Sequence, residues 1–167
     1  MPPSLESIAV RVSRDLKEVV FVGAFAVVCH IGPYRRTRDI DLALATPLSD
    51  EDLGRLGYRI FQEQGKKVIR TQEGVKLDIY TRDVSGIPVS EVFRTAVVKQ
   101  VGSDEIKVMC LEALLIAKMR ASRPQDIEDV QELCRRLGKS IRWDLVDSLG
   151  TEIELAELKN VVSIFSQ

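Results

Sequence analysis

Two aspartates stand out because they interrupt an apolar, strand-like run. In the stretch DIDLALA, residues 39–45, Asp39 and Asp41 are separated only by Ile40. Side chains alternate between the two faces of a strand, so both carboxylates point the same way, with Cα atoms roughly 6.5–7 Å apart. Neighbouring carboxylates repel each other, and burial adds to the cost. A divalent cation would resolve this conflict, because Mg²⁺ prefers oxygen ligands and commonly uses one or two carboxylates with water and substrate phosphate.

A third acid, Asp78, interrupts the later apolar run VKLDIY, residues 75–80. If its strand lies beside residues 39–45, the three carboxylates could hold two Mg²⁺ ions roughly 3.5–4 Å apart, as in phosphoryl-transfer sites. The simpler alternative is that each aspartate faces solvent, because a half-exposed strand also alternates charged and apolar residues. Asp78 alone favours that alternative, and the Asp39–Asp41 pair alone does not decide.

The elements that must position these acids can be predicted from the apolar periodicity and the turn residues. We expect an N-terminal helix capped by Ser4, and then, in chain order, a strand at 19–23, a helix closed by Gly32, a strand at 39–45, a short helix at 49–57, a hairpin across 58–72, a strand at 75–82 and a second hairpin across 94–109. Gly23 falls between a strand and a helix. Such a turn lets backbone N–H groups approach an anion, although one glycine there is also ordinary turn geometry.

The overall pattern predicts an α+β protein. A mixed sheet flanked by helices fills residues 1–109, and residues 110–167 form a C-terminal helical segment that packs on this core. The apolar content is 45% and the net charge is −1, so no global field attracts nucleic acid or an anionic membrane. No apolar run approaches the ~20 residues of a membrane span, and no signal peptide is evident. The three cysteines lack metal-site spacing, and free buried thiols fit a cytoplasmic location.

Taken together, the glycine turn and the acidic strands resemble the nucleotidyltransferase superfamily that includes DNA polymerase beta. The signature of that superfamily is a strand, a Gly-Gly or Gly-Ser turn, a helix, an Asp-x-Asp strand and a third acid on a later strand. Gly23 and Ala24 occupy the two turn positions here, and the three aspartates occupy the acidic positions. Ala24 departs from the signature, because it lacks the serine hydroxyl and its Cβ crowds a phosphate.

The resemblance looks closest to small prokaryotic members, the abortive-infection-type nucleotidyltransferase toxins and their relatives, and it spans residues 21–136. The matching positions are His30–Gly32, Arg35, Thr37, Asp39, Asp41, Lys118, Arg123, Pro124, Asp126 and Asp129.

This resemblance implies a Mg²⁺-dependent transfer of a nucleoside monophosphate from an NTP to a hydroxyl on RNA, such as a tRNA end, or on a protein. It also raises a toxin role with an antitoxin partner. Two Mg²⁺ ions would be held by Asp39, Asp41 and Asp78, and Asp78 would draw the proton from the acceptor. The resemblance adds Lys118 to the catalytic residues. The expected NTP-binding residues are Gly23, Ala24, Arg35, Arg38 and Asp126.

The sequence allows alternative roles for Lys118, for the arginines before the acidic pair and for the protein as a whole. Lys118 could contact phosphate, or it could be a partly buried lysine paired with Asp126 or Asp129; the two are compatible. The arginines before the acidic pair could bind phosphate, balance the acids or lie in a solvated loop. At the level of the whole protein, the alternatives to an enzyme are a weak or inactive relative that binds nucleotide or a partner, and a structural subunit whose acids face solvent.

Overall fold

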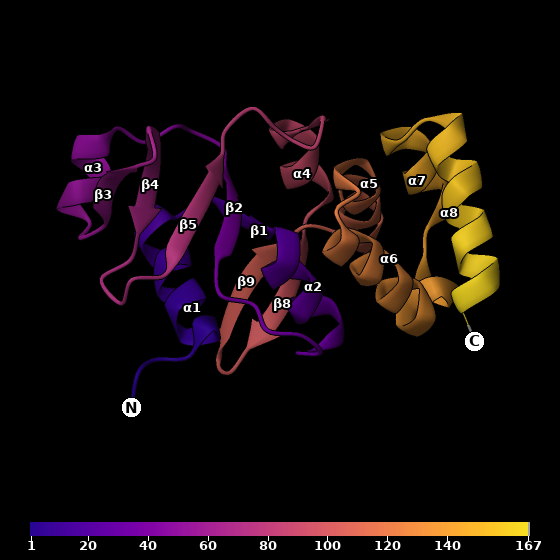
Figure 1. Ribbon diagram of the computed structural model, residues 1–167, viewed down its shortest axis with the longest axis horizontal. Coiled ribbons are helices and arrows are strands. Elements are labelled where there is room, and N and C mark those ends of the chain that lie inside the picture. Colours follow the sequence, from indigo (N-terminus) through magenta and orange to yellow (C-terminus); the bar gives the residue numbers. More distant parts are fainter. Residues whose placement is uncertain (167) are drawn as a thin grey trace.

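A seven-stranded mixed sheet forms the centre of the computed structural model, which describes residues 1–166 (Figure 1). The strand order is β3-β4-β5-β2-β1-β9-β8. The strands are β1 (Val19–Val22), β2 (Ile40–Leu44), β3 (Arg59–Glu63), β4 (Lys66–Arg70), β5 (Lys76–Tyr80), β8 (Val97–Val101) and β9 (Asp104–Val108), and a separate two-stranded hairpin is formed by β6 (Asp83–Val84) and β7 (Ile87–Pro88).

Helices cover the sheet and extend it at one end. They are α1 (Leu5–Leu16), α2 (Gly23–Ile31), α3 (Asp50–Arg55), α4 (Val89–Thr95), α5 (Leu111–Ala121), α6 (Pro124–Leu137), α7 (Trp143–Leu149) and α8 (Glu152–Phe165), with a short 3₁₀ turn at Gly138–Ser140. The side chains of Ser4 and Ser49 accept hydrogen bonds from backbone N–H groups of α1 and α3, which satisfies donors that a helix start leaves free. The predicted α+β architecture is confirmed.

The pairing of the three central strands decides where the acids lie. β1 pairs antiparallel with β2, and β2 pairs parallel with β5. In this register Asp41 lies opposite Val22 on one side and opposite Asp78 on the other. Because side chains alternate along a strand, Asp41 and Ala43 face one side of the sheet while Ile40 faces the other.

The apolar residues divide into two cores, one on each face of the sheet. The core on the side of Asp41 combines residues of β1 and β2 with α5, α6 and α8, for example Val20, Ala43, Leu114 and Leu158. The core on the opposite face holds residues of α1 and α3. The helical segment after Met109 therefore shares a buried core with the sheet. The predicted division into a core of residues 1–109 and a helical segment of residues 110–167 stays a prediction.

Most predicted elements are present, but two were missed. The helix after Ser4, the helix that ends before Gly32 and the helical character of the chain after Met109 are confirmed, and both hairpins, the acidic strands and the helix at 49–57 lie within one to three residues of their expected bounds. The β6–β7 hairpin and α4 were not predicted. β6–β7 turns through Ser85 and Gly86, which both have positive φ, and its strands are only two residues long. α4 has seven residues, too few to show a helical period.

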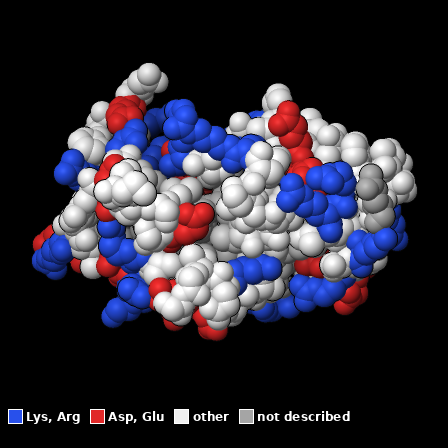
Figure 2. All heavy atoms as spheres, turned by 90° about the horizontal axis from the view of Figure 1, so that it is seen from below, with Lys and Arg blue, Asp and Glu red and all other residues white. Residues whose placement is uncertain are grey.

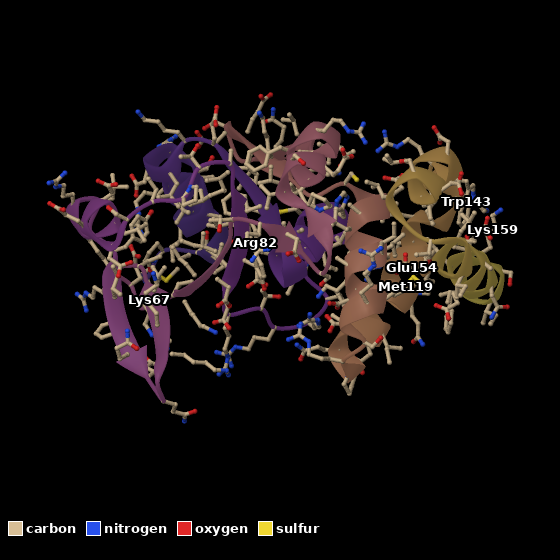
Figure 3. All side chains as sticks on the ribbon, turned by 90° about the horizontal axis from the view of Figure 1, so that it is seen from above. Lys67, Arg82, Met119, Trp143, Glu154 and Lys159 are labelled. Atoms are coloured by element: carbon tan, nitrogen blue, oxygen red, sulfur yellow. The ribbon has the colours of Figure 1, made fainter. Side chains whose placement is uncertain are left out.

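An ion pair and a contact between a cation and an aromatic ring link the C-terminal helices. The guanidinium of Arg120 in α5 donates to both carboxylate oxygens of Glu154 in α8, at 2.7 and 3.1 Å. Lys159 lies over the ring of Trp143, with its Nζ 5.7 Å from the ring centroid (Figure 3).

Basic and acidic side chains both appear on the face shown in Figure 2. In the part of the chain that the structure describes, no helix is long and apolar enough to cross a bilayer.

Leu158 tests how much the last helix contributes to stability. Its side chain is fully buried between α8 and the neighbouring helices, whereas Ile153 on the same helix is 72% exposed. We expect Leu158→Ala to lower the free energy of unfolding by ~2–5 kcal/mol, because it leaves a cavity in the core. The matched change Ile153→Ala should alter it by less than ~0.5 kcal/mol. Urea denaturation followed by the fluorescence of Trp143 measures both; equal effects would contradict the packing of α8.

Candidate active site

A polar cavity of about 350 Å³ opens between the sheet and the C-terminal helices. It gathers residues from the start of α2, from the loop before β2, from β2 and β5, and from α5 and the start of α6. The residues that line it are Ala24, Arg35, Arg36, Thr37, Arg38, Asp39, Asp41, Lys76, Asp78, Tyr80, Lys118, Arg123 and Gln125. Seven of the nine residues predicted for the site line this cavity; Gly23 and Asp126 line a smaller adjoining one of about 60 Å³.

The carboxylates of Asp41 and Asp78 are neighbours on adjacent strands. Burial and the negative charge of Asp78 raise the pKa of Asp41 to about 7. Asp39 is exposed and lies one residue before β2, where it reaches the same cavity. Among residues 1–166, however, no three His, Cys, Asp or Glu side chains form a cluster that could hold a metal ion as they stand. The structure therefore brings two acids together and leaves the third on the cavity wall.

This donor set fits Mg²⁺ when a substrate phosphate is also present. Mg²⁺ typically takes one or two carboxylates and completes its octahedral shell with water and phosphate oxygens. The paired acids would supply the protein oxygens, and Asp39 lies close enough to the same cavity to add another. A second favourable observation is that the Oγ1 atom of Thr37 is buried without a hydrogen-bond partner in the described structure, which leaves a polar group free for a ligand.

Gly23 is needed because Asp41 lies against it. Its φ is +63°, and a Cβ built on it would lie 2.1 Å from Oδ2 of Asp41. Only glycine accommodates both the left-handed conformation and this close approach. The resemblance assigned Gly23 to phosphate binding; the geometry adds a second requirement, because any side chain here would displace the acid. Ala24 follows at the start of α2 and lines the main cavity itself.

Lys118 is buried and paired with both candidate partners. Only 5% of its surface is exposed, and its Nζ lies 2.9 Å from Oδ1 of Asp126 and 2.9 Å from Oδ2 of Asp129. Lys118 nevertheless lines the cavity, and its positive charge acts to lower the pKa of Asp41. The ion-pair alternative is thus what the structure shows, and it leaves the lysine close to the acids.

Asp126 and Asp129, the partners of Lys118, also accept hydrogen bonds from two arginines that line the cavity. Both are fully buried. Arg123 donates to Asp126 from Nε at 2.7 Å, and Arg35 donates to both oxygens of Asp129, at 2.8 and 2.7 Å. The hydroxyl of Tyr34 also donates to Asp129. Burial alone would raise the pKa of Asp126 and Asp129, but hydrogen bonds from these arginines and from Lys118 hold both pKa values below the ordinary range.

This network changes the expected roles of Arg35 and Asp126. The guanidinium of Arg35 is engaged by Asp129, and the carboxylate of Asp126 is engaged by Lys118 and Arg123. Asp129 was not among the predicted site residues, although its spacing after Arg123-Pro124 was noted. Arg36, Thr37, Lys76, Tyr80, Arg123 and Gln125 also line the cavity without having been predicted as site residues.

Arg36 and Arg38 are the cations of the cavity that have no charged partner. Both are exposed, and neither takes part in an ion pair within residues 1–166. Lys76, by contrast, lies with its Nζ 3.3 Å from Oδ1 of Asp78. The loop before the acidic strand thus leaves two guanidinium groups available to a negatively charged ligand.

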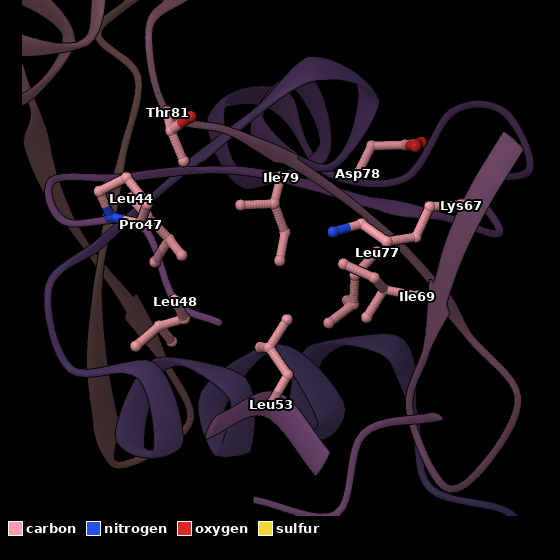
Figure 4. A pocket seen from close by; sticks show the side chains of 10 residues that line it. All are labelled: Leu44, Pro47, Leu48, Leu53, Lys67, Ile69, Leu77, Asp78, Ile79 and Thr81. Carbon is pink, nitrogen blue, oxygen red and sulfur yellow. The ribbon is translucent and has the colours of Figure 1, made fainter. Parts of the chain in front are cut away.

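A second cavity, of about 340 Å³, lies on the other side of β5 (Figure 4). Most of the residues that line it are apolar, and Leu53, Leu77 and Ile79 point into it, as does the amino group of Lys67. The carboxylate of Asp78 is turned away from this cavity. Asp78 therefore belongs to the polar site, which faces the side of the sheet that carries Asp41.

Gly23→Ala tests the close approach of Asp41. Gly102 is a matched control, because its φ is also +63° but a Cβ there would meet nothing within 4 Å. Gly102→Ala should cost ~1–2 kcal/mol of unfolding free energy from backbone strain alone. Gly23→Ala should cost ~1–3 kcal/mol more, because the methyl group must push Asp41 aside. Chemical denaturation measures the difference, and equal costs would show that Asp41 does not need this glycine.

Asp129→Asn tests the buried network. Its side chain accepts from Tyr34, Arg35 and Lys118, so we expect a loss of ~3–5 kcal/mol at neutral pH. The exposed change Asp147→Asn is the control, with an effect below ~0.5 kcal/mol.

The same variant tests the pH dependence of stability. Because the folded-state pKa of Asp129 lies below its unfolded value, its contribution is complete above about pH 4 and is lost as the pH falls further. Urea denaturation between pH 7 and pH 2.5 should therefore show wild type and Asp129→Asn converging in acid. A constant difference across this range would contradict the assignment.

Comparison with known structures places the fold. An antigenic nucleotidyltransferase-like protein from Paracoccidioides brasiliensis superposes with a TM-score of 0.63 and 16% identity, over 96% of this chain and 88% of that one. ANT(2")-Ia in complex with adenylyl-2"-tobramycin gives 0.56 and 15%, over 93% and 97%. JHP933 from Helicobacter pylori gives 0.56 and 16%, over 95% and 88%. At these identities the likeness establishes the shared fold.

A search among curated proteins finds no similar sequence. A family model does match, over residues 4–167, which is nearly the whole chain. Its description is "Nucleotidyl transferase of unknown function (DUF2204)", in agreement with the acids, the glycine turn and the fold described above. The chain belongs to this family of nucleotidyltransferases.

Proposed function

We propose that the protein is a Mg²⁺-dependent enzyme that transfers a nucleoside monophosphate from an NTP to a hydroxyl group. The observation that carries this proposal is the register of β2 and β5, which sets Asp41 beside Asp78 in a cavity that Asp39 also lines. A merely solvent-facing strand would not explain why the chain keeps two repelling carboxylates together in a partly buried place.

The triphosphate would lie between the three aspartates and the loop of residues 35–38, which carries three arginines. Arg36 and Arg38 are exposed at the cavity, and their guanidinium groups, unpaired within residues 1–166, suit phosphate oxygens. Helix α2 begins at Gly23, and Ala24 in its first turn lines the cavity. The backbone N–H groups of this turn would add partial positive charge beside the triphosphate. Arg35 would contribute indirectly, because its bonds to Asp129 fix the loop that carries the other two arginines.

The three aspartates would bind the metal ions and accept a proton. Asp39, Asp41 and Asp78 would hold two Mg²⁺ ions, whose positive charge would serve the transferred phosphoryl group and the leaving pyrophosphate. Asp78 would accept the proton of the acceptor hydroxyl, since it lines the polar cavity beside Asp41. Lys118 would hold positive charge near Asp41 while Asp126 and Asp129 keep it in place.

The acceptor in this proposal is a hydroxyl of RNA or of a protein. Six lysine and arginine side chains line the cavity with three aspartates, a charge balance that favours anionic ligands over polycations. A toxin role with an antitoxin partner is part of the same proposal, and growth arrest on expression of the active protein, relieved by the Asp41 variant, would support it.

Ala24 favours a second candidate, a nucleotide-binding relative with weak or no transfer activity. Its methyl group lies at the turn position where the superfamily has glycine or serine. Calorimetric titration with NTP and Mg²⁺ separates the two functions, because this second candidate binds NTP without labelling any acceptor.

Asp41→Asn is the decisive substitution. Incubation with each α-labelled NTP, total RNA and total protein should label an acceptor with the wild type, and the variant should lose at least about 100-fold of this rate. Its melting temperature without ligands should stay the same or rise, because the change removes repulsion with Asp78. Asp39→Asn and Asp78→Asn should lose activity similarly, and the exposed Asp147→Asn should not. Unchanged labelling by the Asp41 variant would exclude the proposed role.

A further inference from the structure

Tyr80 is an exposed aromatic side chain at the place where the cavity meets the helices. It follows Asp78 by two residues on β5, so both side chains lie on the same face of the sheet. Its surface is 38% exposed, and within the described chain its hydroxyl takes part in no hydrogen bond. It lines both the main cavity and the smaller one beside Gly23. A tyrosine held open in this way presents a ring face to a ligand.

Arg123 faces the same space from the start of α6. It also lines both cavities, and 63% of its side chain is exposed. Two of its guanidinium nitrogens, Nε and Nη2, donate to Asp126 at 2.7 and 3.3 Å, so the plane of the group is fixed from one edge. Tyr80 and Arg123 line the same two cavities, so the two groups lie near one another. Fixed planar groups of this kind stack well on aromatic rings.

We propose that Tyr80 and Arg123 bind the nucleobase of the NTP by stacking on its two faces. This inference rests on the proposed function and deepens it, because it names the part of the cavity that recognises the base. The acids adjoin this pair, because Asp78 lies two residues before Tyr80 on β5, and Arg36 and Arg38 line the same cavity, where they suit the triphosphate. A planar, uncharged ring joined to a triphosphate is the ligand that these two groups of side chains match together.

Stacking also predicts the kind of specificity. Every base has a π-face, so stacking tolerates all four bases and depends on the area of overlap rather than on hydrogen bonds to base edges. We therefore expect purine nucleotides to bind more tightly than pyrimidine nucleotides by about threefold or more, with little difference between ATP and GTP.

The test compares ATP with inorganic tripolyphosphate, which has the phosphates but no base. Isothermal titration in the presence of Mg²⁺ measures Kd for both ligands with the wild type, Tyr80→Phe and Tyr80→Leu. Tyr80→Leu should weaken ATP binding by about tenfold and leave tripolyphosphate binding unchanged, and Tyr80→Phe should retain wild-type affinity for both. Phe61→Leu is the matched control, because Phe61 is 42% exposed on β3 but does not line this cavity, and it should change neither Kd.

The outcomes separate this inference from the function on which it rests. Unchanged ATP affinity in Tyr80→Leu would overturn the stacking role, and so would equal weakening of ATP and tripolyphosphate, which would make Tyr80 a support for the phosphate site. If tripolyphosphate binds as tightly as ATP to the wild type, the base contributes nothing and only this inference fails. If the wild type binds neither ligand with Mg²⁺, the proposed function itself fails.

Discussion

The parallel pairing of β2 with β5 places two carboxylates side by side, and the rest of the site is arranged around their repulsion. Burial and the charge of Asp78 together raise the pKa of Asp41 to about 7. A cluster of this kind is costly unless positive charge is nearby. Lys118 supplies part of that charge from α5, and Arg36 and Arg38 line the same cavity. The electrostatic conflict is therefore local, and it sits where a cation and a triphosphate would relieve it.

Much of this arrangement could be predicted because each feature depends on local sequence. Two aspartates two positions apart in an apolar run must share a face of a strand, and a glycine between a strand and a helix marks a turn. The adjacency of Asp78 to Asp41 was a hypothesis, since no local pattern determines which strands pair; the structure shows it as a register. The hairpin β6–β7 and α4 escaped prediction because each is too short to show a period.

Long-range contacts account for what the sequence left open. Lys118 could be seen as an unusual charge on an apolar helix, but only the fold shows that both Asp126 and Asp129 hold it. The pairing of Arg35 with Asp129 joins residues 94 positions apart, so one of the two loop arginines expected to bind phosphate is engaged. The other, Arg38, and its neighbour Arg36 have no ion-pair partner within residues 1–166. Tyr80 likewise looked like an ordinary strand residue until its exposure at the cavity was known.

The same buried network explains why the C-terminal helices belong to the site. Asp129 of α6 accepts from Tyr34 and Arg35, which lie in the loop leading to the acidic strand. Lys118 of α5 joins that carboxylate to Asp126, which in turn fixes Arg123. A fully buried charge needs its partners, so the loop cannot leave the helices without exposing or stranding an aspartate. The position of Arg36 and Arg38 relative to the acids is thus set by helices that lie about 80 to 90 residues later in the chain.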